Sequence, residues 1–237
     1  MVGRKMRSRG WCRTVNSDLL EQMAESSEAR AAALGPLSPW LDRARDTPPA
    51  PVLVLDGFGV IAEVKRRAPS TGALVSLEDD GVEGAVSRAI AYANAGADAV
   101  SVLTEPSRFA GAMSHLEAAA KALQPLGVPA MRKDFLVSMV QVAEARVAGA
   151  GGVLLIARML PGDHLSELLH LALDLGMFVL VEAFDEDDLA AAARVATAGV
   201  LVGVNTRDLR TLAVDSSRLA RLAPLLPPGV PAVAESG

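Results

Sequence analysis

The chain has 237 residues, 51% of them hydrophobic, a net charge of −5 at pH 7 and few aromatics (one Tyr, two Trp, five Phe). This length suits one large domain with an aliphatic core, as in sheets whose strands are buried on both faces. The net negative charge argues against a nucleic-acid binder, and the lone Cys12 excludes an intrachain disulfide framework. The sequence has no run of about 18 apolar residues that could span a membrane. We therefore expect a soluble, cytoplasmic protein.

Residues 1–58 are predicted to form an N-terminal helical and proline-rich extension. A basic start without a following apolar segment gives no sign of a secretory signal. Residues 18–34 then show the helical spacing of apolar and charged residues. Residues 35–51 contain five prolines, which predicts an irregular connection, with Trp40 and Leu41 free to pack on the main domain.

Residues 59–237 repeat one theme, a short apolar run followed by a stretch with helical spacing. The predicted strands are residues 60–64, 99–103, 129–131, 152–156, 178–181, 200–204 and 231–234. The helices predicted between them are residues 81–95, 112–123, 138–148, 162–175, 186–198 and 216–225. A glycine precedes each strand after the first, where it can end a helix and turn the chain: Gly96, Gly127, Gly149, Gly176, Gly199 and Gly229.

Seven strands alternating with helices predict a parallel sheet with right-handed crossovers, either an open doubly wound sheet or a closed barrel. An open sheet would normally carry a glycine-rich phosphate turn after its first strand, but residues 65–70 read Lys-Arg-Arg-Ala-Pro-Ser. Barrels carry their chemistry at the C-terminal ends of many strands, and this chain has polar residues there. The sequence therefore predicts an α/β fold of the (β/α)8 TIM-barrel class, with strands 1 to 7 in residues 59–237.

Five predicted strands end in polar or charged residues. The first places Glu63 and Lys65 two positions apart, so strand alternation points both to the same side. The other four ends read Arg132-Lys133-Asp134, Glu182, Asn205-Thr206-Arg207-Asp208 and Glu235-Ser236-Gly237. Charges at a barrel mouth are costly unless they are paired or functional. One such strand is as well explained by a structural salt bridge, but five together favour a site.

Such a ring supports acid–base chemistry on an anionic substrate. Lysines there can donate protons and hold anions, glutamates can act as bases when their pKa is tuned, and a Ser-Gly pair entering a helix can bind phosphate. No catalytic triad, dinucleotide motif or metal-ligand cluster is visible, and His115, His164 and His170 lie in helical segments. We therefore expect a small phosphorylated substrate, no cofactor and no metal.

At these residues the sequence resembles the indole-3-glycerol-phosphate synthase family over about residues 59–237. The resemblance rests on several motifs in a shared order: residues 61–66 with Pro69 and Ser70, then 101–105, 132–135, 154–156, 180–182, 203–209 and 235–237. It implies a carbon–carbon lyase of tryptophan biosynthesis. The substrate, 1-(2-carboxyphenylamino)-1-deoxyribulose 5-phosphate, would be converted to indole-3-glycerol phosphate with loss of CO2 and water.

The resemblance also implies roles for individual residues. Lys133 would be the general acid on the ribulose carbonyl, and Lys65 would lie near the substrate carboxylate and phosphate and act as an acid in dehydration. Glu63 and Glu182 would serve as base and as electrostatic partners of the developing positive nitrogen, with Asn205 positioning catalytic groups. The implied substrate-binding residues are Arg207, Phe135, Ser70, Ser236 and Gly237.

The sequence departs from the family pattern in three places. Ala68 and Ala112 stand where the family usually has serine, and the sequence ends at Gly237, with the seventh strand. We expect the eighth β/α unit to be absent, which leaves the first and seventh strands with unpaired edges. The expected state is a monomer or weak homo-oligomer, with association through the open barrel edge.

Two other functions stay open at this stage. Phosphoribosylanthranilate isomerase is a second sugar-phosphate barrel, but its chemistry favours a Cys/Asp acid–base pair, which is not apparent here. A catalytically impaired truncated paralogue, or a barrel fragment that associates with a partner, is the other alternative, and the open edge motivates it.

Overall fold

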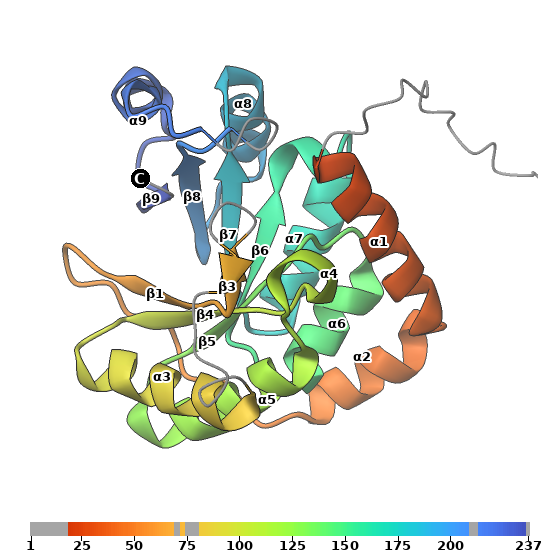
Figure 1. Cartoon of the computed structure of the whole chain (residues 1–237). Helices are drawn as coiled ribbons and strands as arrows, with labels where there is room; N and C mark the ends of the chain where they lie inside the picture. Colours follow the sequence, from red (N-terminus) through yellow and green to blue (C-terminus); the bar gives the residue numbers. More distant parts are fainter. Residues whose placement is uncertain (1–18, 69–71, 74–80, 209–212, 236–237) are drawn as a thin grey trace, which may run out of the picture.

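The computed structural model describes residues 19–68, 72–73, 81–208 and 213–235, and its centre is a curled sheet of seven parallel strands (Figure 1). In spatial order the strands are β1 (Ile61–Val64), β4 (Ala99–Leu103), β5 (Ala130–Lys133), β6 (Gly152–Ile156), β7 (Phe178–Ala183), β8 (Val200–Asn205) and β9 (Ala232–Glu235). Each strand pairs in parallel with the next along the chain, as in a barrel wall. The predicted barrel class and its seven strands are therefore confirmed.

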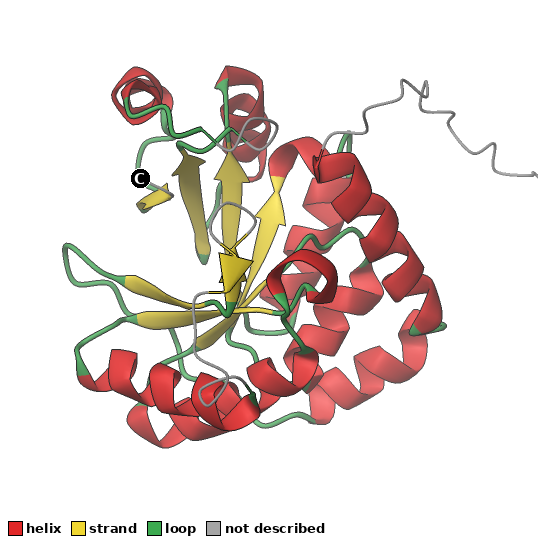
Figure 2. Cartoon of the chain, viewed as in Figure 1, coloured by secondary structure: helices red, strands yellow, loops and turns green. Residues whose placement is uncertain are grey.

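Helices connect the strands and lie outside the curled sheet (Figure 2). They are α3 (Val82–Asn94), α5 (Met113–Leu123), α6 (Met139–Val147), α7 (His164–Asp174), α8 (Glu186–Val195) and α9 (Ser217–Leu222). Sequence patterns placed these strands and helices to within three residues. The structure adds a short helix, α4 (Pro106–Phe109), and a hairpin of β2 (Arg67–Ala68) and β3 (Gly72–Ala73). Within the described ranges, no helix is long and apolar enough to cross a membrane.

Strand alternation separates two apolar layers. Outward residues such as Val100, Val153 and Val179 join the large cluster between the sheet and the helices. Inward residues such as Leu154 and Leu180 form the second cluster, inside the curl. The last inward position of several strands is polar, so the apolar interior gives way to charged groups at the C-terminal strand ends, the barrel mouth.

The six glycines predicted to turn the chain before a strand all have positive φ, which confirms their role. A different glycine is needed for packing. Gly152 pairs with Phe178 in the β6–β7 register, and a methyl group on Gly152 would overlap the Phe178 ring. The Phe178 ring fills the space inside the curl that a side chain at position 152 would need.

The N-terminal extension contains two helices, α1 (Leu19–Ala33) and α2 (Leu37–Asp46). The first was predicted, whereas α2 lies where the sequence predicted an irregular, proline-rich connection. Pro36 is the N-cap of α2 and Pro39 falls in its first turn, where backbone N–H groups have no intrahelical partner. Proline is tolerated there, and the other prolines follow the end of the helix.

Polar contacts fasten the extension to the barrel. Ser27 and Gln141 share a buried hydrogen bond of 2.8 Å, and Arg30 donates two hydrogen bonds of 2.8 Å to the carboxylate of Asp134. Met23 of α1 also joins the inner apolar cluster. The extension therefore packs against the residue that follows Lys133.

Candidate active site

Three charged side chains from two strands meet at the barrel mouth. Lys133, the last residue of β5, places its Nζ atom 3.1 Å from Oε2 of Glu63 on β1. Lys65 follows β1 and forms an ion pair with the same glutamate. Both lysines and the glutamate are partly buried, so the pairs are screened less than surface pairs. The structure thus brings together three of the residues predicted from the sequence.

A second acidic pair completes the ring. Oε2 of Glu235, at the end of β9, lies 3.3 Å from Nζ of Lys133. The buried carboxyl group of Glu182 on β7 lies close enough to the side chains of Glu235 and Asn205 for both to shift its pKa. The strand register pairs Asn205 with Glu235 and Glu182 with Gly203. The ends of five strands, β1, β5, β7, β8 and β9, thus contribute side chains to the group of residues around the Lys133 ammonium.

Gly203 makes room for this arrangement. It occupies an inward position on β8 between Glu182 and the apolar interior, and a methyl group there would overlap Oε1 of Glu235. Because position 203 has no side chain, the Glu235 carboxylate can lie over it and reach Glu182 and Lys133. Glu235 was not predicted as a site residue. It can take this position because Gly203, two residues before Asn205, has no side chain.

The electrostatics keep Lys133 protonated and Glu63 ionised. Burial lowers the pKa of Lys133, but the negative charges of Glu235, Glu63 and Glu182 outweigh it, so this pKa is raised above its ordinary value. Burial raises the pKa of Glu63, but the charges and hydrogen bonds of Lys133 and Lys65 outweigh it, so this pKa is lowered. At neutral pH the pair is an ammonium facing a carboxylate.

Glu182 behaves differently from Glu63. Burial and the negative charge of the adjacent Glu235 raise the pKa of Glu182 well above its ordinary value, against the opposing effects of Lys133 and Asn205. Two carboxyl groups in contact share protons unequally because two adjacent negative charges repel. A carboxylate whose pKa is raised is a stronger base than an ordinary carboxylate, which suits it to accept a proton.

The end of β8 forms a tight turn. The Oδ1 atom of Asn205 accepts a hydrogen bond of 2.9 Å from the backbone N–H of Arg207, and Thr206 N donates to the carbonyl of Glu235 at 3.1 Å. Arg207 is partly buried and forms an antiparallel bridge with Val214. The turn therefore holds Asn205 beside Glu182 and brings Arg207 to the mouth.

An aromatic wall borders the charged ring. The Phe135 ring, two residues after Lys133, lies 6.1 Å from the Phe109 ring, centroid to centroid. Phe135 belongs to the inner apolar cluster, against which Phe109 and, from α1, Leu19 and Leu20 pack. The mouth thus combines charged groups of both signs with neighbouring aromatic side chains, a lining suited to an aromatic group.

A buried network fixes the strand end that carries Lys133. Asp134 accepts hydrogen bonds from Arg30, from Thr104 Oγ1 at 2.6 Å and from its neighbour's N–H, Phe135, at 2.8 Å. Arg132, 1% exposed, donates to Asp134 at 3.2 Å and to Glu144 at 2.7 Å. The charged motif of this strand is therefore split: Lys133 faces the mouth, whereas its neighbours are structural.

The remaining predicted site residues, Ser70, Ser236 and Gly237, lie outside the described residues. The histidines are in helices as expected, with His115 buried against Arg66 at 3.2 Å and His170 exposed. Glu235 is the residue that sequence reasoning left out of the site. Its position at the last inward place of a strand was the available signal, since Glu182 occupies the equivalent place.

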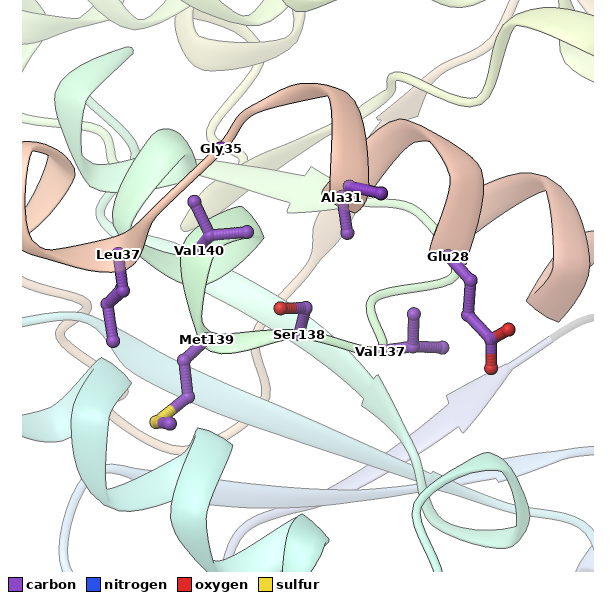
Figure 3. A pocket seen from close by; sticks show the side chains of 9 residues that line it. Glu28, Ala31, Gly35, Leu37, Val137, Ser138, Met139 and Val140 are labelled. Carbon is purple, nitrogen blue, oxygen red and sulfur yellow. The ribbon is translucent and has the colours of Figure 1, made fainter. Parts of the chain in front are cut away.

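A cavity of about 370 Å³ lies elsewhere, between the end of α1 and the start of α6 (Figure 3). Its apolar lining includes Ala31, Leu37, Val137 and Met139, and Glu28 is the one titratable residue among the described residues that line it. It contains none of the predicted site residues. The chemistry-bearing groups gather at the mouth and not in this cavity.

Comparisons with known proteins agree with the geometry. Residues 54–237 match the model of the family described as indole-3-glycerol phosphate synthase. Proteins named indole-3-glycerol phosphate synthase are similar to the chain: one from Parafrankia sp. is 46% identical over 88% of the chain and 74% of the relative, and one from Nocardioides sp. is 44% identical over 94% and 80%. Among solved structures, a Xanthomonas albilineans dihydropteroate synthase is similar in fold, with a TM-score of 0.55 at 18% identity, over 79% of this chain and 76% of that one.

Proposed function

The chain belongs to the indole-3-glycerol phosphate synthase family, and from this membership we propose that the ring of groups around Lys133 closes the indole ring. The substrate is 1-(2-carboxyphenylamino)-1-deoxyribulose 5-phosphate. A bond forms between the ring carbon that bears the carboxylate and the ribulose carbonyl carbon, CO2 leaves, and loss of water gives indole-3-glycerol phosphate. The observation that carries the proposal is the meeting of Lys133, Glu63, Glu182 and Glu235 at one point.

Lys133 acts as the general acid of ring closure. The attack on the carbonyl carbon makes its oxygen negative, and a protonated amine beside that oxygen stabilises the charge and supplies the proton. The carboxylates around Lys133 raise its pKa, so the ammonium form is present when substrate arrives. Its ion pairs with Glu63 and Glu235 hold the Nζ atom in place.

Glu182 and Glu63 have different roles because their environments differ. The carboxyl group of Glu182 has a raised pKa and can accept a proton from the intermediate. Glu63 keeps its negative charge, which stabilises the positive charge that develops on the substrate nitrogen during ring closure. Asn205 lies beside Glu182 and favours its ionised form, and Glu235 joins this group as a second partner of Lys133.

The substrate's two ends fit two parts of the mouth. The aromatic ring packs against Phe135, beside Phe109. Lys65 and Arg207 provide positive charge for the carboxylate and phosphate, and Lys65 is also placed to protonate the hydroxyl that leaves as water. Ser70, Ser236 and Gly237 are further phosphate ligands in this proposal.

Turnover by the 237-residue chain tests the proposal, measured by the fluorescence of the indole product. Lys133→Met should lower kcat on the order of 10²- to 10⁴-fold in a chain that still folds and unfolds cooperatively. Lys121→Met, an exposed lysine of α5, is the matched control and should leave kcat unchanged. Turnover retained by Lys133→Met, or absent from a folded wild-type chain, would overturn the proposal.

The oligomeric state is a separate part of the proposal. Among the described strands, β1 and β9 each pair with one neighbour, and Phe58 just before β1 is 96% exposed. Edge strands present unpaired N–H and C=O groups that favour association. We therefore expect a monomer or a weak homo-oligomer that associates through this edge. Light scattering across a concentration series should show a mass that rises with concentration, and less so in Phe58→Ser.

A further inference from the structure

Arg218 lies in the first turn of α9 and has no part in the proposed mechanism. Its side chain is 13% exposed, and its Nη1 atom donates to the carbonyl of Asn205 at 2.9 Å and to that of Arg207 at 3.4 Å. Both acceptors belong to the turn after β8 that carries two proposed site residues. An arginine from the helix layer outside the sheet therefore donates hydrogen bonds to backbone carbonyls at the barrel mouth.

The location of Arg218 is unfavourable for the helix that carries it. The first turn of a helix prefers acidic residues because the helix dipole is positive there. Desolvating a guanidinium group also costs free energy unless its donors are satisfied. Its Nε atom is buried without a hydrogen-bond partner, with the nearest charge, Asp215, 3.9 Å away. Helix stability thus does not explain an arginine here, whereas its two carbonyl contacts do.

The contacts run from Arg218 to the catalytic carboxyl group in two steps. Arg218 fixes the carbonyl of Asn205, while the side chain of Asn205 accepts from the N–H of Arg207 and lies close enough to Glu182 to lower its pKa. Asp215, three residues before Arg218, closes the base of the turn by donating its N–H to the carbonyl of Thr206 at 2.9 Å. Rotation of the Asn205 peptide would therefore move the group that orients Glu182.

We propose that Arg218 is a positioning residue, which holds the turn of Asn205, Thr206 and Arg207 and thereby keeps the Asn205 amide on Glu182. The part of this inference that concerns rate rests on the proposed function, whereas the part that concerns the turn does not. A displaced catalytic group of about 1 Å costs on the order of 100-fold in rate.

Arg221 offers a matched control because it lies one turn further along the same helix. It pairs with Glu186 of α8, and both side chains are about half exposed. Exposed pairs contribute little to stability. Arg218→Met and Arg221→Met thus remove the same charge from the same helix, and only the first removes contacts with the turn.

Two measurements test the proposal. Arg218→Met should lower kcat roughly 10- to 100-fold and move the acid limb of the pH–rate profile to higher pH, because Glu182 loses the partner that favours its ionised form. Arg218→Lys, which keeps the charge and one donor, should recover part of the loss. Arg221→Met should match the wild type in both respects. Equal effects of the two methionine variants, or an unmoved profile in Arg218→Met, would overturn the positioning role.

Hydrogen exchange of single amides provides the readout that does not depend on turnover. The amides of Thr206, Arg207 and Asp215 should exchange faster in Arg218→Met than in the wild type, and at wild-type rates in Arg221→Met. Faster exchange would support the role of Arg218 in holding the turn even if the chain showed no turnover. Absence of turnover would overturn only the proposed function. Unchanged exchange at these three amides would show that Arg218 does not hold the turn, and would overturn the inference.

Discussion

The Nζ atom of Lys133 lies 3.1 Å from the Oε2 atom of Glu63, and this ion pair joins the ends of β5 and β1 across the intervening strand β4. Curling of the sheet brings these strand ends together at the mouth. The pair couples the charge state of the proposed acid to that of a carboxylate on another strand, so each residue can be probed through the other.

Glu63→Gln should therefore lower the pKa of Lys133. The neutral amide removes one of the negative charges that raise this pKa, so Lys133 loses its proton at lower pH. The alkaline limb of the pH–rate profile should move to lower pH, and kcat should fall because the charge opposite the substrate nitrogen is gone. Glu117→Gln, an exposed residue of α5, should leave the limb in place. An unmoved limb in Glu63→Gln would show that another group sets it.

Glu182→Gln should abolish the acid limb of the profile and lower kcat on the order of 10²- to 10⁴-fold. The folded chain holds the Glu182 proton more tightly than the unfolded chain, so this group contributes stability below its ordinary pKa that is lost as pH rises through its raised, folded value. The amide resembles the protonated acid and does not ionise. The variant should thus gain stability relative to the wild type as pH rises above the ordinary pKa of a glutamate, measured as the difference in unfolding temperature. A difference that does not change with pH would contradict the raised pKa.

Asp134→Asn should change the response to acid in the opposite direction. The hydrogen bonds of Arg30 and Thr104 and the charges of Arg132 and Arg30 outweigh burial and lower the pKa of Asp134 from 3.8 to about 2. Its contribution, about 2 kcal/mol, is present above the ordinary pKa and is lost as pH falls from about 4 to 2. The amide lacks this titration, but it leaves Arg30 without its carboxylate and Arg132 with Glu144 alone, which costs about 3–5 kcal/mol at pH 7.

Urea unfolding at pH 7 and at pH 3 measures both effects. Asp42→Asn is the control, because Asp42 forms an exposed pair with Arg45 at 4.0 Å and should contribute little at either pH. If Asp134→Asn lost stability between the two pH values as steeply as the wild type, Asp134 would not be the residue that titrates.

Much of this fold could be predicted from the sequence because the strands are short apolar runs set off by glycines with positive φ, such as Gly149 and Gly199. Helix α2 was missed because its prolines lie at the start of the helix and beyond its end, where the proline rule for helix interiors does not apply. The hairpin of β2 and β3 was missed because two-residue strands carry no periodicity.

The sequence predicted most of the residues of the candidate site, but not which of them contact one another. Alternation alone places Glu63, Lys133 and Glu182 on the inner face, so the ring of charges follows from the sequence. The direction in which the pKa of each carboxyl group is shifted depends on distances across strands that are far apart in the chain. Glu235 is the clearest case, since its contact with Glu182 depends on a missing side chain on the strand between them.

Gly203→Ala tests that last relationship. The added methyl group would overlap Oε1 of Glu235, so the carboxylate must leave its place beside Glu182 and Lys133. Position 203 is extended strand and alanine fits its backbone, so the effect should fall on activity more than on folding. We expect kcat to fall roughly 10- to 100-fold, since it depends on placement to within about 1 Å. Glu235→Asp, which shortens the side chain by one methylene, should lower kcat by itself.

The double variant distinguishes displacement of Glu235 from a general disturbance of β8. A shorter carboxylate leaves space for the methyl group, so the Gly203→Ala substitution should cost less in the Glu235→Asp background than in the wild type. Residues in contact deviate from additivity by 0.5–3 kcal/mol as an order of magnitude, which corresponds to about 2- to 150-fold in kcat. Strictly additive effects would place the cost of Gly203→Ala elsewhere on the strand and would remove Gly203 from the architecture of the site.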